Sequence, residues 1–203
     1  LTLVNDLDRD RVLWVGDDRK KATLSAFYTE LGAPGCARLE SVAMDMWIPY
    51  IWATREHVPD ADRRIVFDKF HVAQHLGRAV DEVRRAENRE LVAQGDHRLK
   101  HTKYAWLTNR HNMSAKRWRD FAPLRHSRLR VVRVWAIKES AMLRWNYTRR
   151  GWAERAWAQW YTWAIRSRLA PIKRVATMIR ECWAGVMNAA SRNVTNARSE
   201  GMN

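Results

Sequence analysis

Cysteine is scarce in this chain, and its scarcity argues against two kinds of site. The 203 residues contain only Cys36 and Cys182, which lie far apart in the sequence. Two distant cysteines do not make a disulfide framework. The chain also lacks the Cys-x-x-Cys spacing that a cysteine-based metal site commonly uses. Neither a disulfide scaffold nor a cysteine metal centre is therefore predicted.

Long hydrophobic runs are also absent. The most apolar stretch covers residues 44–53 and is interrupted by Asp45, whereas a bilayer-spanning helix needs about 20 apolar residues. The first residue is Leu, and no charged segment followed by an apolar one opens the chain. We therefore expect no membrane partner and a cytoplasmic location.

Acidic residues are the minority charge, with 22 Asp and Glu against 37 Lys and Arg, a net of +15. Residues 1–62 hold 7 basic and 11 acidic side chains, a net of −4, and residues 63–203 hold 30 and 11, a net of +19. A coding bias toward Arg explains Arg in place of Lys but not the excess of base over acid. A basic footprint of this kind is typical of a polyanion partner, so we predict nucleic-acid binding.

The predicted elements run from strands at the start of the chain to helices later. Apolar, β-branched runs predict strands over residues 1–4, 11–15, 39–44 and 65–67. Apolar side chains at three- and four-residue spacing predict helices over residues 21–31, 47–57, 72–91, 129–146, 152–166 and 171–182. The buried stripe expected for the helix 129–146 comprises Leu129, Val132, Ala136 and Leu143. This order is typical of a sheet segment followed by an all-helical segment.

Two of the predicted strands end on an aspartate. Asp45 follows the strand 39–44, and Asp68 follows the strand 65–67. Strand ends at one edge of an open α/β sheet are where ligands and metals bind. For either aspartate alone, capping of the following helix is the more common explanation. Asp45, Asp68 and the distant Glu200 are nevertheless the acidic residues best placed for two-metal phosphoryl transfer, which needs carboxylates on a rigid scaffold.

Basic clusters with interspersed tryptophan are the candidates for nucleic-acid contact. Trp118 lies between two arginines and could stack on an unpaired base, with packing inside the protein as an equal alternative. Together the clusters would neutralise several phosphates, which predicts binding that weakens steeply with salt. The predicted nucleic-acid-binding residues are Arg84, Arg85, Lys116, Arg117, Trp118, Arg119, Arg125, Arg128, Arg130, Arg149 and Arg150.

Four stretches, residues 11–19, 42–50, 65–72 and 199–203, resemble bacterial insertion-sequence transposases of the ISL-three family. These are DDE enzymes with an RNase H-like core. The most specific stretch is the strand followed by Asp68, Lys69 and Phe70. The resemblance implies that Asp45 is the second catalytic aspartate and Glu200 the catalytic glutamate. Both would be ligands of two Mg²⁺ or Mn²⁺ ions. Asp68 lies outside this triad, as a helix cap or a group that orients the ligands.

The resemblance also implies an architecture, an α/β fold that is mostly helical overall. Residues 1–71 would form part of the RNase H-like sheet, and residues 72–185 a large basic all-α insertion. Residues 186–203 would start the helix that returns Glu200 to the core. The family's first catalytic aspartate lies on its first strand, and this chain is expected to begin on the second. We therefore expect an incomplete core and a C-terminal fragment that neither cleaves nor joins DNA alone.

The implied function is DNA transposition and recombination of a mobile element. Its partners would be the terminal repeats of the insertion sequence, the target DNA and further copies of the protein, bound at the bacterial nucleoid. Whether the chain alone is an enzyme is left open. The alternative is a non-catalytic basic helical protein that binds nucleic acid, or a decayed remnant.

Overall fold

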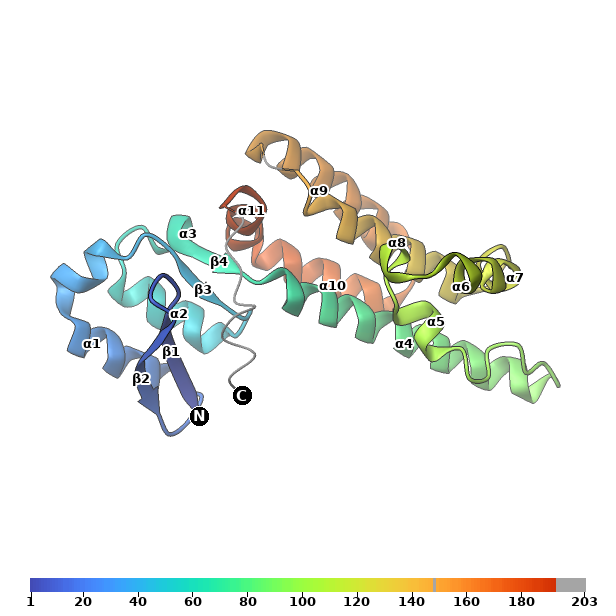
Figure 1. Ribbon diagram of the computed structural model, residues 1–203, viewed down its shortest axis with the longest axis horizontal. Helices are drawn as coiled ribbons and strands as arrows, with labels where there is room; N and C mark the ends of the chain where they lie inside the picture. Colours follow the sequence, from blue (N-terminus) through green and yellow to red (C-terminus); the bar gives the residue numbers. More distant parts are fainter. Residues whose placement is uncertain (148, 193–203) are drawn as a thin grey trace. The chain divides into compact units, whose positions relative to one another are not determined.

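The computed structural model describes residues 1–147 and 149–192, and its contacts divide the chain into two compact units (Figure 1). The described residues of the first unit are 1–71, 149–150 and 182–192, and those of the second are 72–147 and 151–181. The described chain is mostly helical, as predicted, and its strands all lie in the first unit. The second unit carries 23 Lys and Arg against 9 Asp and Glu, so it holds a net +14 of the total +15.

The described strands form two separate two-stranded sheets. β1 (Thr2–Asp6) and β2 (Arg11–Gly16), both predicted as strands, form an antiparallel hairpin. β3 (Val42–Met44) and β4 (Ile65–Phe67) pair in parallel. All three residues of β4 are buried, as expected for an apolar strand in a parallel pair. Because β3 and β4 are parallel, their carboxyl ends lie at the same edge.

The helices of the first unit include α1 (Lys21–Arg38), α2 (Ile48–His57), α3 (Ala61–Arg64) and α11 (Trp183–Arg192). The predicted end of the first helix near residue 31 corresponds to a kink at Gly32, where φ is 72°. Only glycine adopts this conformation without strain, and helix resumes after it. Leu24, Phe27 and Tyr28 are buried on one face of α1. The Tyr28 hydroxyl lies 2.9 Å from the Thr54 hydroxyl, which ties α1 to α2.

Helix α11 packs against β4 and α3, and it joins the far end of the chain to the first unit. The Asn188 side-chain amide donates to the backbone oxygens of Asp62, at 2.9 Å, and Ile65, at 2.8 Å. Arg150 in turn donates to the Asn188 side-chain oxygen at 2.9 Å. A Cβ atom at Gly185 would overlap the buried ring of Phe67. This position therefore has no room for a side chain.

Replacing Gly185 with alanine is expected to lower the free energy of unfolding by about 1–3 kcal/mol, because overpacking forces neighbouring groups to shift. Urea unfolding would measure the loss, and adding Phe67→Leu should recover part of it. Gly151→Ala is the matched control, since nothing lies within 4 Å of its Cβ position. Equal stability of the two alanine variants would contradict the close approach of α11 to β4.

The second unit is built from helices alone in its described residues. The helices are α4 (Lys69–Ala93, whose first three residues belong to the first unit), α5 (Lys103–Leu107), α6 (Ala115–Asp120), α7 (Ala122–Arg125), α8 (Arg130–Arg144), α9 (Arg150–Arg166) and α10 (Ala170–Glu181), with a short 3₁₀ turn at Arg110–Asn112. Leu76 and Val80 of α4 and Trp157 and Trp160 of α9 are fully buried. The Trp160 indole N–H donates to the backbone oxygen of Ile137 at 2.9 Å, so a large apolar ring is buried with its polar atom satisfied.

The predicted buried stripe of α8 is wrong. Its buried residues are Val131, Val134, Ile137, Lys138 and Ala141, whereas Leu143 is exposed. Lys138 belongs to the buried stripe because its Nζ donates to the Leu107 backbone oxygen at 3.2 Å and to Glu139 at 2.7 Å. Burial lowers the pKa of Lys138. A lysine therefore occupies the core-facing position that hydrophobic spacing reserves for an apolar residue.

Glu87 on α4 caps the start of α8. One carboxylate oxygen accepts from the backbone N–H of Arg130 at 2.7 Å, and the other accepts from that of Val131 at 2.8 Å. These two N–H groups lie in the first turn, where a helix has no acceptors of its own. The same arginine forms an ion pair with the exposed Glu90 through its side chain. A buried acid on one helix thus supplies the N-cap of another.

Candidate functional site

Asp45 lies directly after β3, at the edge to which β3 and β4 direct their carboxyl ends. One of its oxygens, Oδ2, lies 2.6 Å from the Arg19 guanidinium. The other, Oδ1, is buried and has no hydrogen-bond partner among the described residues. A buried acceptor without a partner is costly in a folded protein. In Asp45, Oδ2 is therefore paired with Arg19, whereas Oδ1 remains available to a ligand.

Arg19 holds Asp45 from the loop between β2 and α1, and sequence reasoning missed this residue. Its backbone oxygen accepts from the Trp47 indole N–H at 3.2 Å, and its guanidinium lies 6.0 Å from the Trp47 ring centroid. Burial opposes the charge of Arg19, yet the adjacent Asp45 carboxylate raises the pKa of the guanidinium. The two residues are 26 positions apart, so no local sequence pattern links them. Arg19 and Trp47 together fix the orientation of the Asp45 carboxylate.

Asp68 occupies the equivalent place after β4, and its side chain is buried. Its Oδ1 accepts from the backbone N–H of Phe70 at 2.8 Å, in the first turn of α4. Its own N–H points to the Met44 backbone oxygen at 3.4 Å, which continues the pairing of β3 with β4. This is the geometry of a helix cap at the same edge as Asp45.

Glu200, the other predicted catalytic residue, lies outside the described residues. Within residues 1–147 and 149–192, no group of three or more His, Cys, Asp or Glu side chains could hold a metal ion. The described part of the chain thus contributes Asp45 as the carboxylate with an available oxygen at this edge. Hard divalent cations such as Mg²⁺ prefer such oxygen donors, so the chemistry of Asp45 fits the ion that the resemblance implies.

Several of the predicted nucleic-acid-binding cations have partners within the protein. Arg84 and Arg85 both pair with Asp81, and Lys116 pairs with Asp120. Arg117 donates to the Tyr104 backbone oxygen at 2.8 Å. Arg130 is paired with Glu87 and Glu90, and Arg150 donates to Asn188. The exposed members of the set outside such pairs, within the described chain, are Arg119, Arg128 and Arg149.

Trp118 is half-buried against other side chains of the second unit. Its ring centroid lies 4.2 Å from the Arg110 guanidinium and 3.9 Å from that of Arg125. It also lies 6.1 Å from the Trp135 ring centroid and 6.4 Å from that of Phe121. Protein side chains therefore cover much of the Trp118 ring.

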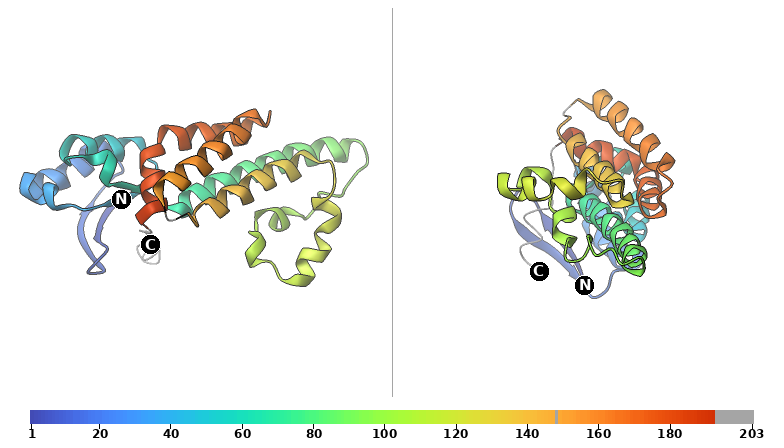
Figure 2. Two further views of the ribbon diagram at one scale, coloured as in Figure 1. Left: turned by 90° about the horizontal axis from the view of Figure 1, so that it is seen from above. Right: turned by 90° about the vertical axis from the view of Figure 1, so that its right-hand side faces the viewer.

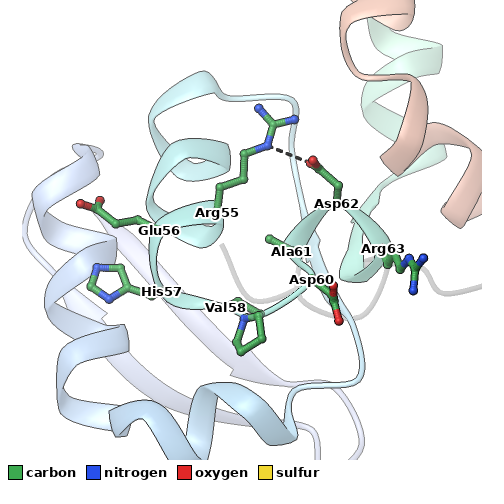
Figure 3. A pocket seen from close by; sticks show the side chains of 9 residues that line it. Arg55, Glu56, His57, Val58, Asp60, Ala61, Asp62 and Arg63 are labelled. Carbon is green, nitrogen blue, oxygen red and sulfur yellow. Dashed lines mark hydrogen bonds and ion pairs between the residues drawn. The ribbon is translucent and has the colours of Figure 1, made fainter.

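A surface pocket of about 650 Å³ is lined by residues 55–63, from the end of α2 through α3 (Figure 3). Within its lining the Arg55 Nε donates to Asp62 at 2.8 Å. None of the predicted catalytic or nucleic-acid-binding residues lines it. The edge that bears Asp45 is therefore the better candidate site.

Comparison with known proteins matches the chain over its whole length. The family DDE_Tnp_ISL3, described as a transposase, matches residues 1–203. The chain is 29% identical over 205 residues to the transposase for insertion sequence element IS1001 of Bordetella parapertussis. It is 27% identical over 229 residues to the transposase for insertion sequence element IS1557 of Mycobacterium tuberculosis. All of this chain but only 50% of each relative is covered, so the chain spans about half their length. No solved structure matches the chain significantly.

Proposed function

Because the chain belongs to the transposase family DDE_Tnp_ISL3, we propose that it is the C-terminal portion of a DDE transposase that cuts and joins DNA at insertion-sequence ends. The observation that carries the catalytic part is the Asp45 carboxylate at the end of β3. Its Oδ2 is fixed by Arg19, and its Oδ1 is buried without a partner in the described chain. A carboxylate fixed through Oδ2 is preorganised to offer its Oδ1 to a cation.

Asp45, Glu200 and a carboxylate from the remainder of the longer protein would hold two Mg²⁺ or Mn²⁺ ions. When bound, two such metal ions activate the attacking oxygen and stabilise the leaving oxygen of a phosphodiester. The chain itself positions the ligand, since β3, Arg19 and Trp47 fix Asp45. Water would cleave the element end, and the freed 3′-hydroxyl would then displace an oxygen of a target phosphodiester. No protein nucleophile is needed for either step.

In this proposal, residues 1–71 belong to an RNase H-like core, residues 72–185 are an insertion and residues 186–203 lead to Glu200. The separate pairs β1–β2 and β3–β4 support it, because a strand from elsewhere in the protein could join them. Asp68 caps α4 beside the site. The working assembly would contain more than one copy of the protein on paired DNA ends, in the bacterial cytoplasm.

The direct experiment incubates a full-length transposase that carries this chain with Mg²⁺ and DNA of its element end. Strand cleavage that requires the divalent ion supports the proposal. Cleavage that persists in a chelator would refute the two-metal mechanism. Among the described residues no helix is long and apolar enough to span a membrane.

A non-catalytic DNA-binding role is the second candidate, favoured by the concentration of charge in the second unit. That unit carries a net +14, and cations that meet phosphates release counterions from DNA. This role needs no carboxylate at the sheet edge. The two candidates differ in their response to Asp45 substitution. Under the catalytic proposal the substitution should abolish DNA cleavage and leave DNA binding unchanged, whereas under the non-catalytic role there is no cleavage for it to abolish.

DNA affinity is expected to fall steeply with salt under either candidate. With about six phosphate contacts, log Kd should rise with log salt with a slope of about 5. Arg119→Gln and Arg128→Gln should each reduce that slope by about 1, because both arginines are exposed. Arg84→Gln is the control, since Arg84 is largely buried against Asp81. Fluorescence anisotropy titrations between 50 and 300 mM salt would measure this slope for each variant. A Kd that does not change with salt would exclude a phosphate-binding surface.

A further inference from the structure

Helix α9 carries a stripe of aromatic and basic side chains that none of the roles above uses. Its members are Trp152, Arg155, Gln159, Trp163 and Arg166, and all are exposed. Their spacing of three, four, four and three residues places them along one face of a helix. Trp152 is 56% exposed and Trp163 is 41% exposed. We call these five residues the α9 stripe.

The α9 stripe is distinct from the face by which α9 is anchored. Ala153, Ala156, Trp157, Trp160 and Ala164 form the buried face of α9. They hold the helix firmly, and α9 is an outer helix of its unit (Figure 2). The exposed indoles are therefore presented from a rigid element. Eleven residues separate Trp152 from Trp163, so the two rings lie about 16 Å apart along the helix axis.

The positive charge of the α9 stripe favours a polyanion as its binding partner. The stripe contains two arginines and no acidic residue, and it belongs to the unit with a net charge of +14. Within the described chain neither Arg155 nor Arg166 takes part in an ion pair. The Arg155 guanidinium instead lies 5.5 Å from the Trp152 ring centroid. Both arginines are thus available to a phosphate beside an exposed ring.

We propose that the α9 stripe binds unpaired nucleotides of DNA, with Trp152 and Trp163 stacking on bases and Arg155 and Arg166 contacting the adjoining phosphates. The proposal deepens the proposed function and rests on DNA being the substrate of this protein. Within a base-paired duplex the faces of the bases are covered by their neighbours, and a protein meets their edges in the grooves. Unpaired bases expose the faces on which an indole can stack. A surface with two projecting indoles therefore fits unpaired nucleotides better than duplex DNA.

The test compares a thymidine 15-mer with a duplex of the same length, using the full 203-residue chain. Trp152→Ala and Trp163→Ala should each weaken binding of the 15-mer about tenfold, as expected for the loss of one stacked base. Together they should weaken it about 30- to 100-fold and leave duplex affinity within about twofold. Trp152→Phe with Trp163→Phe should restore most of the loss, because an aromatic ring is kept. Far-UV circular dichroism would verify that each variant is folded.

Trp52→Ala is the matched control, since Trp52 is also 56% exposed but lies on α2 of the first unit. It should bind both DNA forms like the unaltered chain. Equal weakening of 15-mer and duplex by the α9 variants, or no weakening of either, would overturn the stacking role while leaving DNA as the substrate. Failure of the unaltered chain to bind DNA of either form would overturn the DNA-binding proposal itself. A protein partner whose capture is lost in the α9 variants, with 15-mer affinity unchanged, would instead assign the stripe to protein binding.

Discussion

Asp45→Asn in a full-length transposase that carries this chain is expected to reduce metal-dependent DNA cleavage by about 10³-fold or more. The carboxylate would share two cations, whose stabilisation of the transition state is worth several kcal/mol, and about 1.4 kcal/mol corresponds to a tenfold change in rate. An amide oxygen is neutral and binds a divalent ion much more weakly. The assay would detect the loss of the negative charge of this carboxylate, whose Oδ1 is buried without a partner in the described chain.

This loss of activity should not reflect unfolding. The Asp45 side chain is 26% exposed, and its partner Arg19 is 56% exposed. Solvent screens such a pair, so its removal costs at most about 1 kcal/mol. Asp8→Asn, an exposed residue of the β1–β2 turn in the same unit, is the control and should cleave normally. Normal cleavage by Asp45→Asn would refute the assignment of Asp45 as a metal ligand.

Glu87→Ala is expected to lower the free energy of unfolding of the second unit by about 3 kcal/mol. The substitution removes a buried acceptor and leaves the N–H groups of Arg130 and Val131 without partners. Hydrogen bonds to a charged group are worth about 1.5–3 kcal/mol, and an unsatisfied buried donor adds its desolvation penalty. Urea unfolding followed by tryptophan fluorescence reports this unit, which holds eight of the twelve tryptophans.

Glu90→Ala provides a matched comparison, because Glu90 pairs with the same arginine but is 58% exposed. Exposed ion pairs contribute between about 0 and 1 kcal/mol, so this variant should unfold nearly like the unaltered protein. Glu87→Gln keeps one acceptor oxygen and should fall between the two. Similar losses for Glu87→Ala and Glu90→Ala would show that capping across helices contributes little.

The strands and the helix breaks could be predicted because their signals are local. Apolar, β-branched runs predict the strands of the hairpin and β4, and Gly32 marks the kink in α1 at the expected place. The face of α8 could not be predicted in the same way. Apolar residues surround much of this helix, so helical spacing fits more than one face, and the buried one carries Val131, Val134, Ile137 and Ala141. Lys138 lies on the same face because its ammonium group finds acceptors on α5 and on α8 itself, and no local pattern indicated these tertiary partners.

The candidate site likewise contains one residue with a local sequence signal and one that depends on a tertiary partner. Asp45 is predictable because it follows an apolar strand, and a carboxylate there is a local signal. Arg19, which fixes it, lies 26 residues earlier in a polar loop and resembles any solvated arginine. The resemblance implied a helix that returns to the core from residue 186, but no local pattern indicated that Gly185 packs against Phe67. Sequence identifies reactive groups more readily than the groups that orient them.

The discontinuity of the first unit has a consequence for the order of events on the ribosome. Asn188, which anchors α11, follows its acceptor Asp62 by 126 residues. At about 5–20 residues per second, roughly 6–25 s pass between the synthesis of β4 and that of the helix that covers it. The second unit is complete once residue 181 has emerged, whereas the first still lacks α11. All residues of the second unit are therefore synthesised before α11, and the unit that bears Asp45 can be completed only afterwards.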